Sequence, residues 1–123
     1  MPASVVLPWP PKALNPNGRL HWAKTARAKK SYREACYYTA RAAGLSAASF
    51  SPAPKLALEL VVYPPDKRLR DVDNIVASLK AGLDGLADAL GVNDHRFVLS
   101  VVLKPEIGGF IKANLHEIEE ETC

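Results

Sequence analysis

The alternation of apolar and polar residues along the chain predicts two helices and four strands. Apolar residues recur at three- and four-residue steps over residues 21–43 and 72–90, as they do in amphipathic helices. Short apolar or alternating runs, bounded by proline and glycine, predict strands at residues 4–9, 56–63, 97–104 and 110–118. The order β-α-β-α-β-β therefore predicts an α+β fold: a single domain over residues 1–123, with two helices packed on one mixed β-sheet.

The segments between these elements carry turn-forming residues. Residues 12–19 contain Asn-Pro-Asn-Gly, and residues 45–54 are rich in serine, alanine and proline, so we expect both segments to be loops. The pair Gly108-Gly109 favours a hairpin between the last two strands. Trp9 and Trp22 are expected in the core.

Composition argues against several classes of protein. Hydrophobic residues make up 48% of the chain and charged residues 24%, as in ordinary globular domains. No apolar run approaches the roughly 18 residues of a membrane-spanning helix, and the first residues lack the basic start of a signal peptide. Cys36 and Cys123 have no partners at zinc-site spacing. We therefore expect a cytoplasmic protein that does not enter a membrane.

The net charge of +3 is unevenly distributed along the chain. Residues 1–54 hold eight lysines and arginines against one acid, whereas residues 55–123 hold eight against twelve. The first half is the candidate surface for nucleic-acid phosphates, although basic helix surfaces also serve solubility. The residues expected to contact DNA are Lys24, Arg27, Lys29, Lys30, Arg33, Lys67, Arg68 and Arg70.

The run Arg70-Asp71-Val72-Asp73-Asn74 stands where the second helix begins. Mg²⁺ prefers a few carboxylate oxygens, with waters and substrate phosphates completing its shell. Two carboxylates beside basic residues are what a metal-dependent nuclease needs. On a 3.6-residue period, Asp73, Ala77, Lys80 and Asp84 share one helix face, away from the apolar stripe.

A third acid, Asp94, follows this helix. The helix spans about 28 Å. Asp94 therefore reaches Asp71 only if the next strand folds back beside residues 56–63, or if a second subunit supplies the partner. Simpler roles also fit these residues, because Asp71 or Asp73 is a natural N-cap and Lys80 suits an ion pair with Asp84.

The chain resembles the RusA family of Holliday junction resolvases, the crossover-junction endodeoxyribonucleases of bacteria and their phages. The resemblance covers most of the chain, from Val6-Leu7-Pro8-Trp9-Pro10-Pro11 through the basic helix, and is strongest from Arg70 to Phe97. It implies Mg²⁺ or Mn²⁺ as cofactor, a homodimer, and cleavage of branched DNA. It also implies that the catalytic, metal-binding residues are Asp71, Asp73 and Asp94.

Two positions depart from the family pattern. Many members carry the catalytic lysine three residues after the asparagine, where this chain has Ala77. Phage-type members are similar to this chain, with the lysine one turn later, so the catalytic role falls to Lys80. The family often has aspartate at the position of Asn93; we assign metal binding to Asp94 and leave the role of Asn93 open.

Three functions remain open from the sequence. The first is an endonuclease that resolves four-way Holliday junctions by paired nicks, in the cytoplasm of a bacterial or phage-infected cell. The second is a broader structure-specific nuclease that cuts flaps or forks in phage DNA processing with the same site. The third is a non-catalytic nucleic-acid-binding module whose acids only cap helices and pair with cations. The set Asp71, Asp73 and Asp94 argues against the third.

Overall fold

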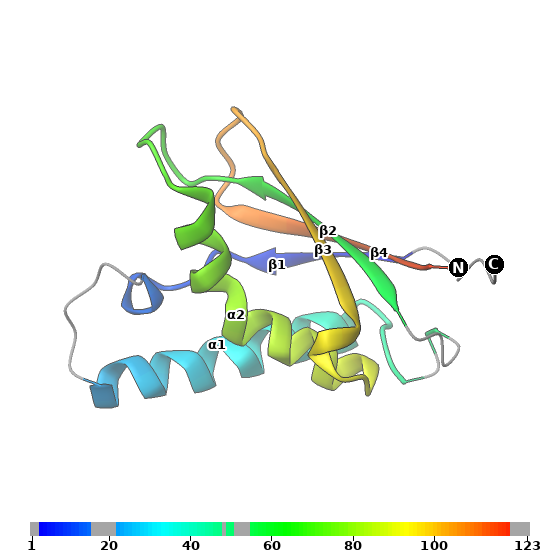
Figure 1. Cartoon of the computed structure of the whole chain (residues 1–123). Coiled ribbons are helices and arrows are strands. Elements are labelled where there is room, and N and C mark those ends of the chain that lie inside the picture. Colours follow the sequence, from blue (N-terminus) through cyan, green and yellow to red (C-terminus); the bar gives the residue numbers. More distant parts are fainter. Residues whose placement is uncertain (1–2, 16–21, 48, 51–54, 119–123) are drawn as a thin grey trace.

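The computed structural model describes residues 3–15, 22–47, 49–50 and 55–118. Two helices lie on one face of a four-stranded mixed sheet (Figure 1). The elements are β1 (Ala3–Pro8), the 3₁₀ turn η1 (Lys12–Leu14), α1 (Trp22–Ala42), β2 (Leu56–Tyr63), α2 (Val72–Leu90), the 3₁₀ turn η2 (Asp94–Arg96), β3 (Phe97–Leu103) and β4 (Phe110–Glu117). The predicted α+β class and element order are confirmed.

The sheet has the strand order β1-β4-β2-β3. β3 pairs with β2 in parallel, since α2 carries the chain back between them, and β4 pairs antiparallel with both β2 and β1. The predicted hairpin between the last two strands is therefore wrong. The turn instead crosses the end of β2, where the Gly109 amide donates to the Tyr63 carbonyl. Gly109 adopts a positive φ of 78° there, which glycine tolerates best.

The core lies between the sheet and the two helices. Every second residue of β2 is buried toward the helices, and α2 meets them with an apolar stripe of buried residues: Ile75, Leu79, Leu83, Leu86 and Leu90. The two helices approach closely because α2 has Gly82 and Gly85 where it meets α1; a Cβ at Gly85 would overlap the Arg33 carbonyl. The buried stripe fixes the rotation of α2, so its opposite face is turned to solvent.

The first turns of α1 extend beyond the sheet (Figure 1). Only Tyr32, Cys36 and Ala40 of this helix are buried. Trp22 is 75% exposed, so the prediction that it belongs to the core is wrong. Periodicity placed it on the apolar stripe, but the buried residues of α1 begin only at Tyr32, so the stripe is not buried over the first turns of the helix. Trp9 is half-buried against the core, as expected.

The Cys36 thiol is fully buried beside Tyr32, and burial raises the pKa of Cys36 to about 11. In a Cys123→Ser variant, which leaves Cys36 as the sole thiol, we expect almost no reaction with Ellman's reagent at pH 8 and one reactive thiol in denaturant. Rapid reaction of the native protein would contradict this packing of α1.

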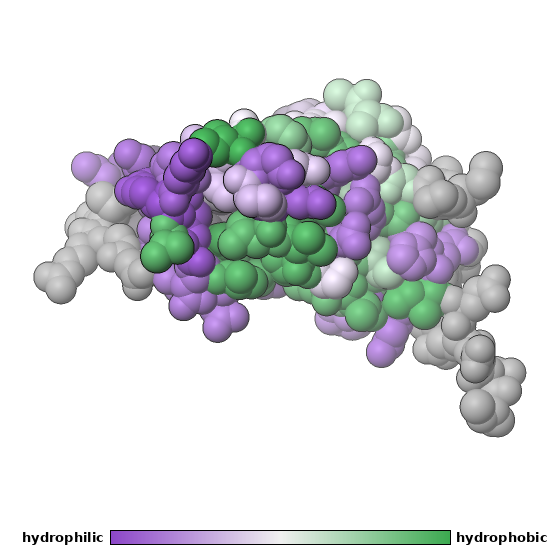
Figure 2. All heavy atoms as spheres, turned by 90° about the horizontal axis from the view of Figure 1, so that it is seen from above, coloured by the Kyte–Doolittle hydropathy of each residue, from purple (hydrophilic) through white to green (hydrophobic). Residues whose placement is uncertain are grey.

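β3 is an edge strand with apolar side chains exposed on both faces of the sheet. Val98, Leu99, Val102 and Leu103 are 39–45% exposed. Figure 2 looks onto the sheet from the side opposite the helices and shows apolar side chains gathered in a central patch with polar residues around it. Within the described residues, neither helix is long and apolar enough to cross a membrane.

Candidate metal and DNA site

Asp71 and Asp73 lie at the exposed start of α2. Asp71 is the N-cap, and its Oδ1 accepts a hydrogen bond of 2.9 Å from the Asp73 amide. The capping role foreseen for one of the two acids thus belongs to Asp71. Capping engages one oxygen, whereas a carboxylate has two oxygens and about four lone-pair sites. Asp73 stands in the first turn with its side chain exposed. Both carboxylates therefore keep oxygens for a ligand.

Arg70 fixes the loop that leads into this turn. Its Nη1 lies 2.8 Å from the Asp66 carboxylate and donates to the Asp66 and Arg68 carbonyls. Its guanidinium also lies over the Trp9 ring, 5.4 Å from the centroid. The hydrogen bond from Arg70 holds the pKa of Asp66 well below its ordinary value. The Arg70 side chain is 16% exposed, so its first task here is positional; its DNA contact stays a prediction.

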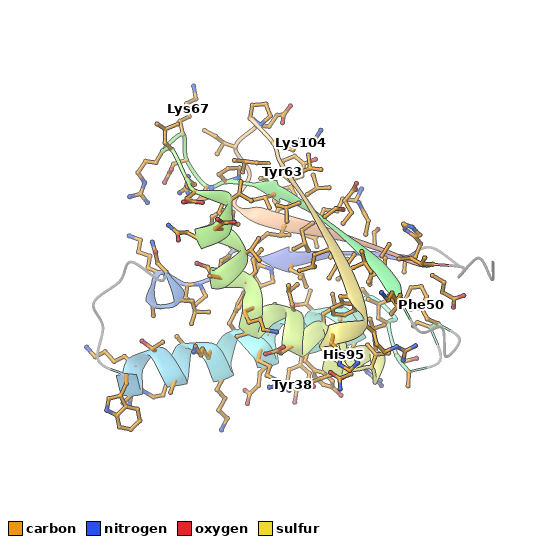
Figure 3. All side chains as sticks on the ribbon, viewed as in Figure 1. Tyr38, Phe50, Tyr63, Lys67, His95 and Lys104 are labelled. Carbon is orange, nitrogen blue, oxygen red and sulfur yellow. The ribbon has the colours of Figure 1, made fainter. Side chains whose placement is uncertain are left out.

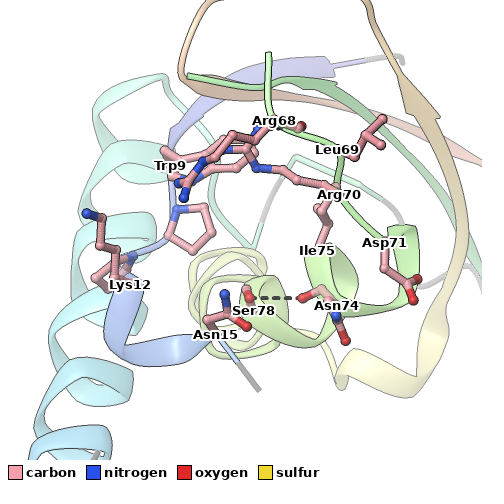
Figure 4. A pocket seen from close by; sticks show the side chains of 12 residues that line it. Trp9, Lys12, Asn15, Arg68, Leu69, Arg70, Asp71, Asn74, Ile75 and Ser78 are labelled. Carbon is pink, nitrogen blue, oxygen red and sulfur yellow. Dashed lines mark hydrogen bonds between the residues drawn. The ribbon is translucent and has the colours of Figure 1, made fainter. Parts of the chain in front are cut away.

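A hollow of about 200 Å³ opens next to Asp71, where three segments of the chain meet (Figure 4). The segment after β1, the loop before α2 and the first turns of α2 each line part of it. One wall is aromatic and cationic, and the other is polar: Trp9, Arg68 and Arg70 on the first, Asn15, Asn74 and Ser78 on the second. Sequence reasoning missed this hollow, because residues 9–15 and 68–78 meet only through the tertiary fold.

Asp94 lies at the opposite end of α2 from Asp71. η2 begins at Asp94, and Phe97 then pairs with Leu56, the first residue of β2, whereas the loop to Asp71 leaves from the last. Figure 3 shows the separation: Lys67, before Asp71, lies at one end of the molecule and His95 lies at the other. The side chain of Asp94 lies outside the described part of the structure. One chain therefore holds Asp71 and Asp73 together and carries Asp94 elsewhere.

Lys80 and Ala77 lie on the exposed face of α2 that begins at Asp73, as predicted. Lys80 is about 10 Å along the helix axis from Asp73, at 1.5 Å per residue. Its Nζ lies 3.5 Å from Asp84 Oδ1, so the alternative role as an ion-pair partner is also present. The Lys80 side chain is 64% exposed, and such surface pairs contribute little stability.

A groove of about 600 Å³ runs between α1 and α2. α1 contributes Lys29, Lys30 and Arg33 to it, and α2 contributes Lys80 and Asp84. Ser78 lines both this groove and the hollow beside Asp71, so the two adjoin. Basic side chains thus border a path that leads to the acidic turn.

Four of the other predicted DNA contacts are exposed, in two pairs, and Arg33 differs from them. Lys24 and Arg27 are exposed on the first turns of α1, and Lys67 and Arg68 are exposed on the loop before α2. Arg33 is different, because it makes a two-pronged ion pair with Asp88 at 2.6 and 2.9 Å. That pair lowers the pKa of Asp88 and links the helices, so Arg33 has a structural task.

Among the residues whose side chains the structure describes, no three histidine, cysteine or acidic side chains gather to hold a metal. Asp71 and Asp73 supply two hard oxygen donors at one turn. Mg²⁺ is commonly held by one or two carboxylates together with substrate phosphates and water. The donor pair fits that chemistry, with room left for a further ligand.

No family model matches the chain. An uncharacterized protein of Xylella fastidiosa (strain Temecula1) is 42% identical over 104 residues, which cover 85% of this chain and 68% of that protein. Identity at this level over most of both chains reflects common descent and a shared fold. The chain therefore belongs to the same family as this Xylella protein.

Proposed function

We propose that the protein is a metal-dependent endonuclease that hydrolyses phosphodiester bonds in branched DNA and resolves Holliday junctions by paired nicks. The observation that carries the proposal is the exposed pair Asp71 and Asp73, next to a groove bordered by Lys29, Lys30 and Lys80. Hard oxygen donors beside a basic track suit a polyanion whose backbone is cut with a divalent ion. The resemblance to RusA-type resolvases points to the same chemistry, in the cytoplasm of a bacterial or phage-infected cell.

Asp71 and Asp73 would hold Mg²⁺, with Mn²⁺ as a substitute. When bound, the ion would lower the pKa of an attacking water and stabilise charge on the phosphoryl oxygens. Lys80 would stabilise the developing charge or orient the water from the same helix face. The N-cap hydrogen bond holds the Asp71 carboxylate in place, and Arg70 holds the loop behind it.

A homodimer would complete the site with Asp94 of the partner subunit. β3 is an edge strand with exposed apolar side chains on both faces, as expected for a strand that another copy covers. Antiparallel pairing of two β3 strands about a two-fold axis brings the start of one strand to the end of the other. The end of β3 adjoins the end of β2, from which the chain leads to Asp71. The partner's Asp94 would thus approach Asp71 and Asp73.

The proposal is tested by a cleavage assay on four DNAs of equal length: a four-way junction, a flap, a fork and a linear duplex, each in Mg²⁺ and in EDTA. We expect paired nicks in the junction, in Mg²⁺ only. Faster cleavage of flaps or forks than of the junction would favour the broader structure-specific nuclease. Binding to all four without Mg²⁺- or Mn²⁺-dependent cleavage would identify a non-catalytic module.

Replacing Lys80 by alanine should lower turnover by about 10²–10³-fold, the usual loss when one donor to a developing oxyanion is removed. DNA affinity should change little, because one exposed lysine among many contributes a small share of phosphate binding. Single-turnover cleavage and gel-shift titrations separate the two effects. Lys112→Ala, on the exposed outer face of β4, is the matched control. A loss in affinity alone would make Lys80 a phosphate anchor.

Replacing Lys24, Lys29 and Lys30 by glutamine should weaken binding to every DNA shape. Each lost phosphate contact lowers the log–log salt slope by about 0.9, so the triple variant should lose about 2.7. Arg33 is kept because it pairs with Asp88. The double variant Lys55→Gln/Lys112→Gln is the control. If the slope of the triple variant does not change, DNA lies elsewhere, along Lys67 and Arg68.

A further inference from the structure

The hollow beside Asp71 has the size for a small ring system. Its volume of about 200 Å³ is several times the roughly 30 Å³ share of one water molecule in the liquid. It is also smaller than the roughly 300–1,000 Å³ of sites that enclose drug-sized ligands. A metal ion would leave most of this space empty, and a folded peptide would not enter it.

The charges around the hollow favour an anion. Three cations lie there, Lys12, Arg68 and Arg70, against the carboxylates of Asp66 and Asp71, so the local sum is +1. The Arg68 side chain is 74% exposed and can turn toward a ligand in the opening. An organic molecule with one phosphate matches this balance.

The walls of the hollow suit a nucleobase. On one side the Arg70 guanidinium lies over the Trp9 ring, which makes a flat surface of the kind on which bases stack. On the other side lie the amide of Asn15 and the hydroxyl of Ser78 (Figure 4). Ser78 donates to the Asn74 carbonyl, and its oxygen keeps lone pairs that accept from a base N–H.

We propose that this hollow binds one unstacked nucleotide of a DNA strand, with its base between the Trp9–Arg70 wall and Ser78, and its phosphate toward Lys12 and Arg68. The inference rests on the proposed function, which makes DNA the source of the nucleotide. Unstacking a base costs less where pairing is already interrupted, as at a branch point. Leu69, at the rim, is fully exposed and is placed to fill the gap that the base leaves in the stack.

Trp9 reports on this site directly. In a Trp22→Phe protein, Trp9 is the sole tryptophan, and its fluorescence is followed while each deoxynucleoside 5′-monophosphate is added, with excitation at the red edge to avoid absorption by the base. We expect a saturable change in the millimolar range. Asn15→Ala should weaken the affinity by about five- to tenfold, as for one lost hydrogen bond. Ser78→Leu, which fills the hollow, should abolish the change.

Asn114→Ala is the matched control, because Asn114 lies in β4 and donates to Glu59 away from the hollow. Circular dichroism checks that each variant is folded, and inorganic phosphate is titrated separately. If inorganic phosphate changes the Trp9 fluorescence as much as the nucleotides do, the hollow is only an anion site and the proposal is wrong. The proposal is also wrong if the folded Ser78→Leu variant binds nucleotides with unchanged affinity. This titration measures binding and not cleavage, so its outcome is independent of the nuclease assay. If the protein binds nucleotides but does not cleave DNA, the nucleotide site stands and the proposed nuclease function fails. If it cleaves DNA but does not bind nucleotides, only the nucleotide site is refuted.

Discussion

Asp71→Asn, Asp73→Asn and Asp94→Asn are each expected to reduce cleavage of branched DNA to background, a loss of at least about 10²–10³-fold. Each change keeps the shape of the side chain and removes the charge that holds a divalent ion. Folding should survive, because Asp71 and Asp73 are exposed and asparagine is as good an N-cap as aspartate. Cleavage in Mg²⁺, circular dichroism and junction binding are the measurements.

Asp88→Asn is the matched control for these three variants. Asp88 is also an exposed carboxylate of α2, but its partner is Arg33 on α1. We expect slightly lower stability and normal cleavage. Near-normal turnover by any of the three site variants would remove that aspartate from the site, and loss of junction binding would point to a damaged fold.

Two inactive variants should restore activity when they share one dimer. Consider a heterodimer of one Asp73→Asn chain and one Asp94→Asn chain. If each site is built across the subunits, one of the two sites carries both substitutions and the other carries neither. If each chain built its own site, both sites would stay mutated. We therefore expect about half of the wild-type nicking rate from a dimer with one intact site of two. The products should be single nicks rather than paired ones.

The experiment uses two affinity tags and purification over both, so that only heterodimers are assayed. Heterodimers of Asp71→Asn and Asp73→Asn chains are the control. Both residues of a site come from the same chain in either arrangement, so each site of this dimer keeps one substitution. Cleavage by this control dimer would contradict a site shared across β3. The same holds if the Asp73→Asn/Asp94→Asn heterodimer binds junctions with wild-type affinity but does not cleave them.

Local patterns predicted most of the elements correctly. The bounds of α2 and β2 follow from stripes and runs that end at proline or glycine, and Asp71 caps α2 because its side chain needs only the amide two residues ahead. The hairpin was mispredicted because pairing depends on the whole sheet: β3 takes the free edge of β2, and β4 then fills the opposite one.

The parts of the site that escaped prediction depend on distant contacts. Arg70 meets Trp9 only after β1 and the loop before α2 have come together, so sequence spacing gave no sign of it. The position of Asp94 follows from the parallel register of Phe97 with Leu56, which no local pattern encodes. Trp22 fits a helical stripe, but periodicity does not say where the covering layer stops.

The place of β4 between β1 and β2 has a consequence for how the protein folds. β4 is the last of the four described strands, yet among the described residues it alone joins β1 to the sheet, and the pairing of Ala3 with Leu115 closes a loop that runs from residue 3 to residue 115. Contacts of such long range are slow to form. On the ribosome β1 has to wait for β4, and a later break in β4 releases β1 from the sheet, whereas β4 without β1 stays paired with β2.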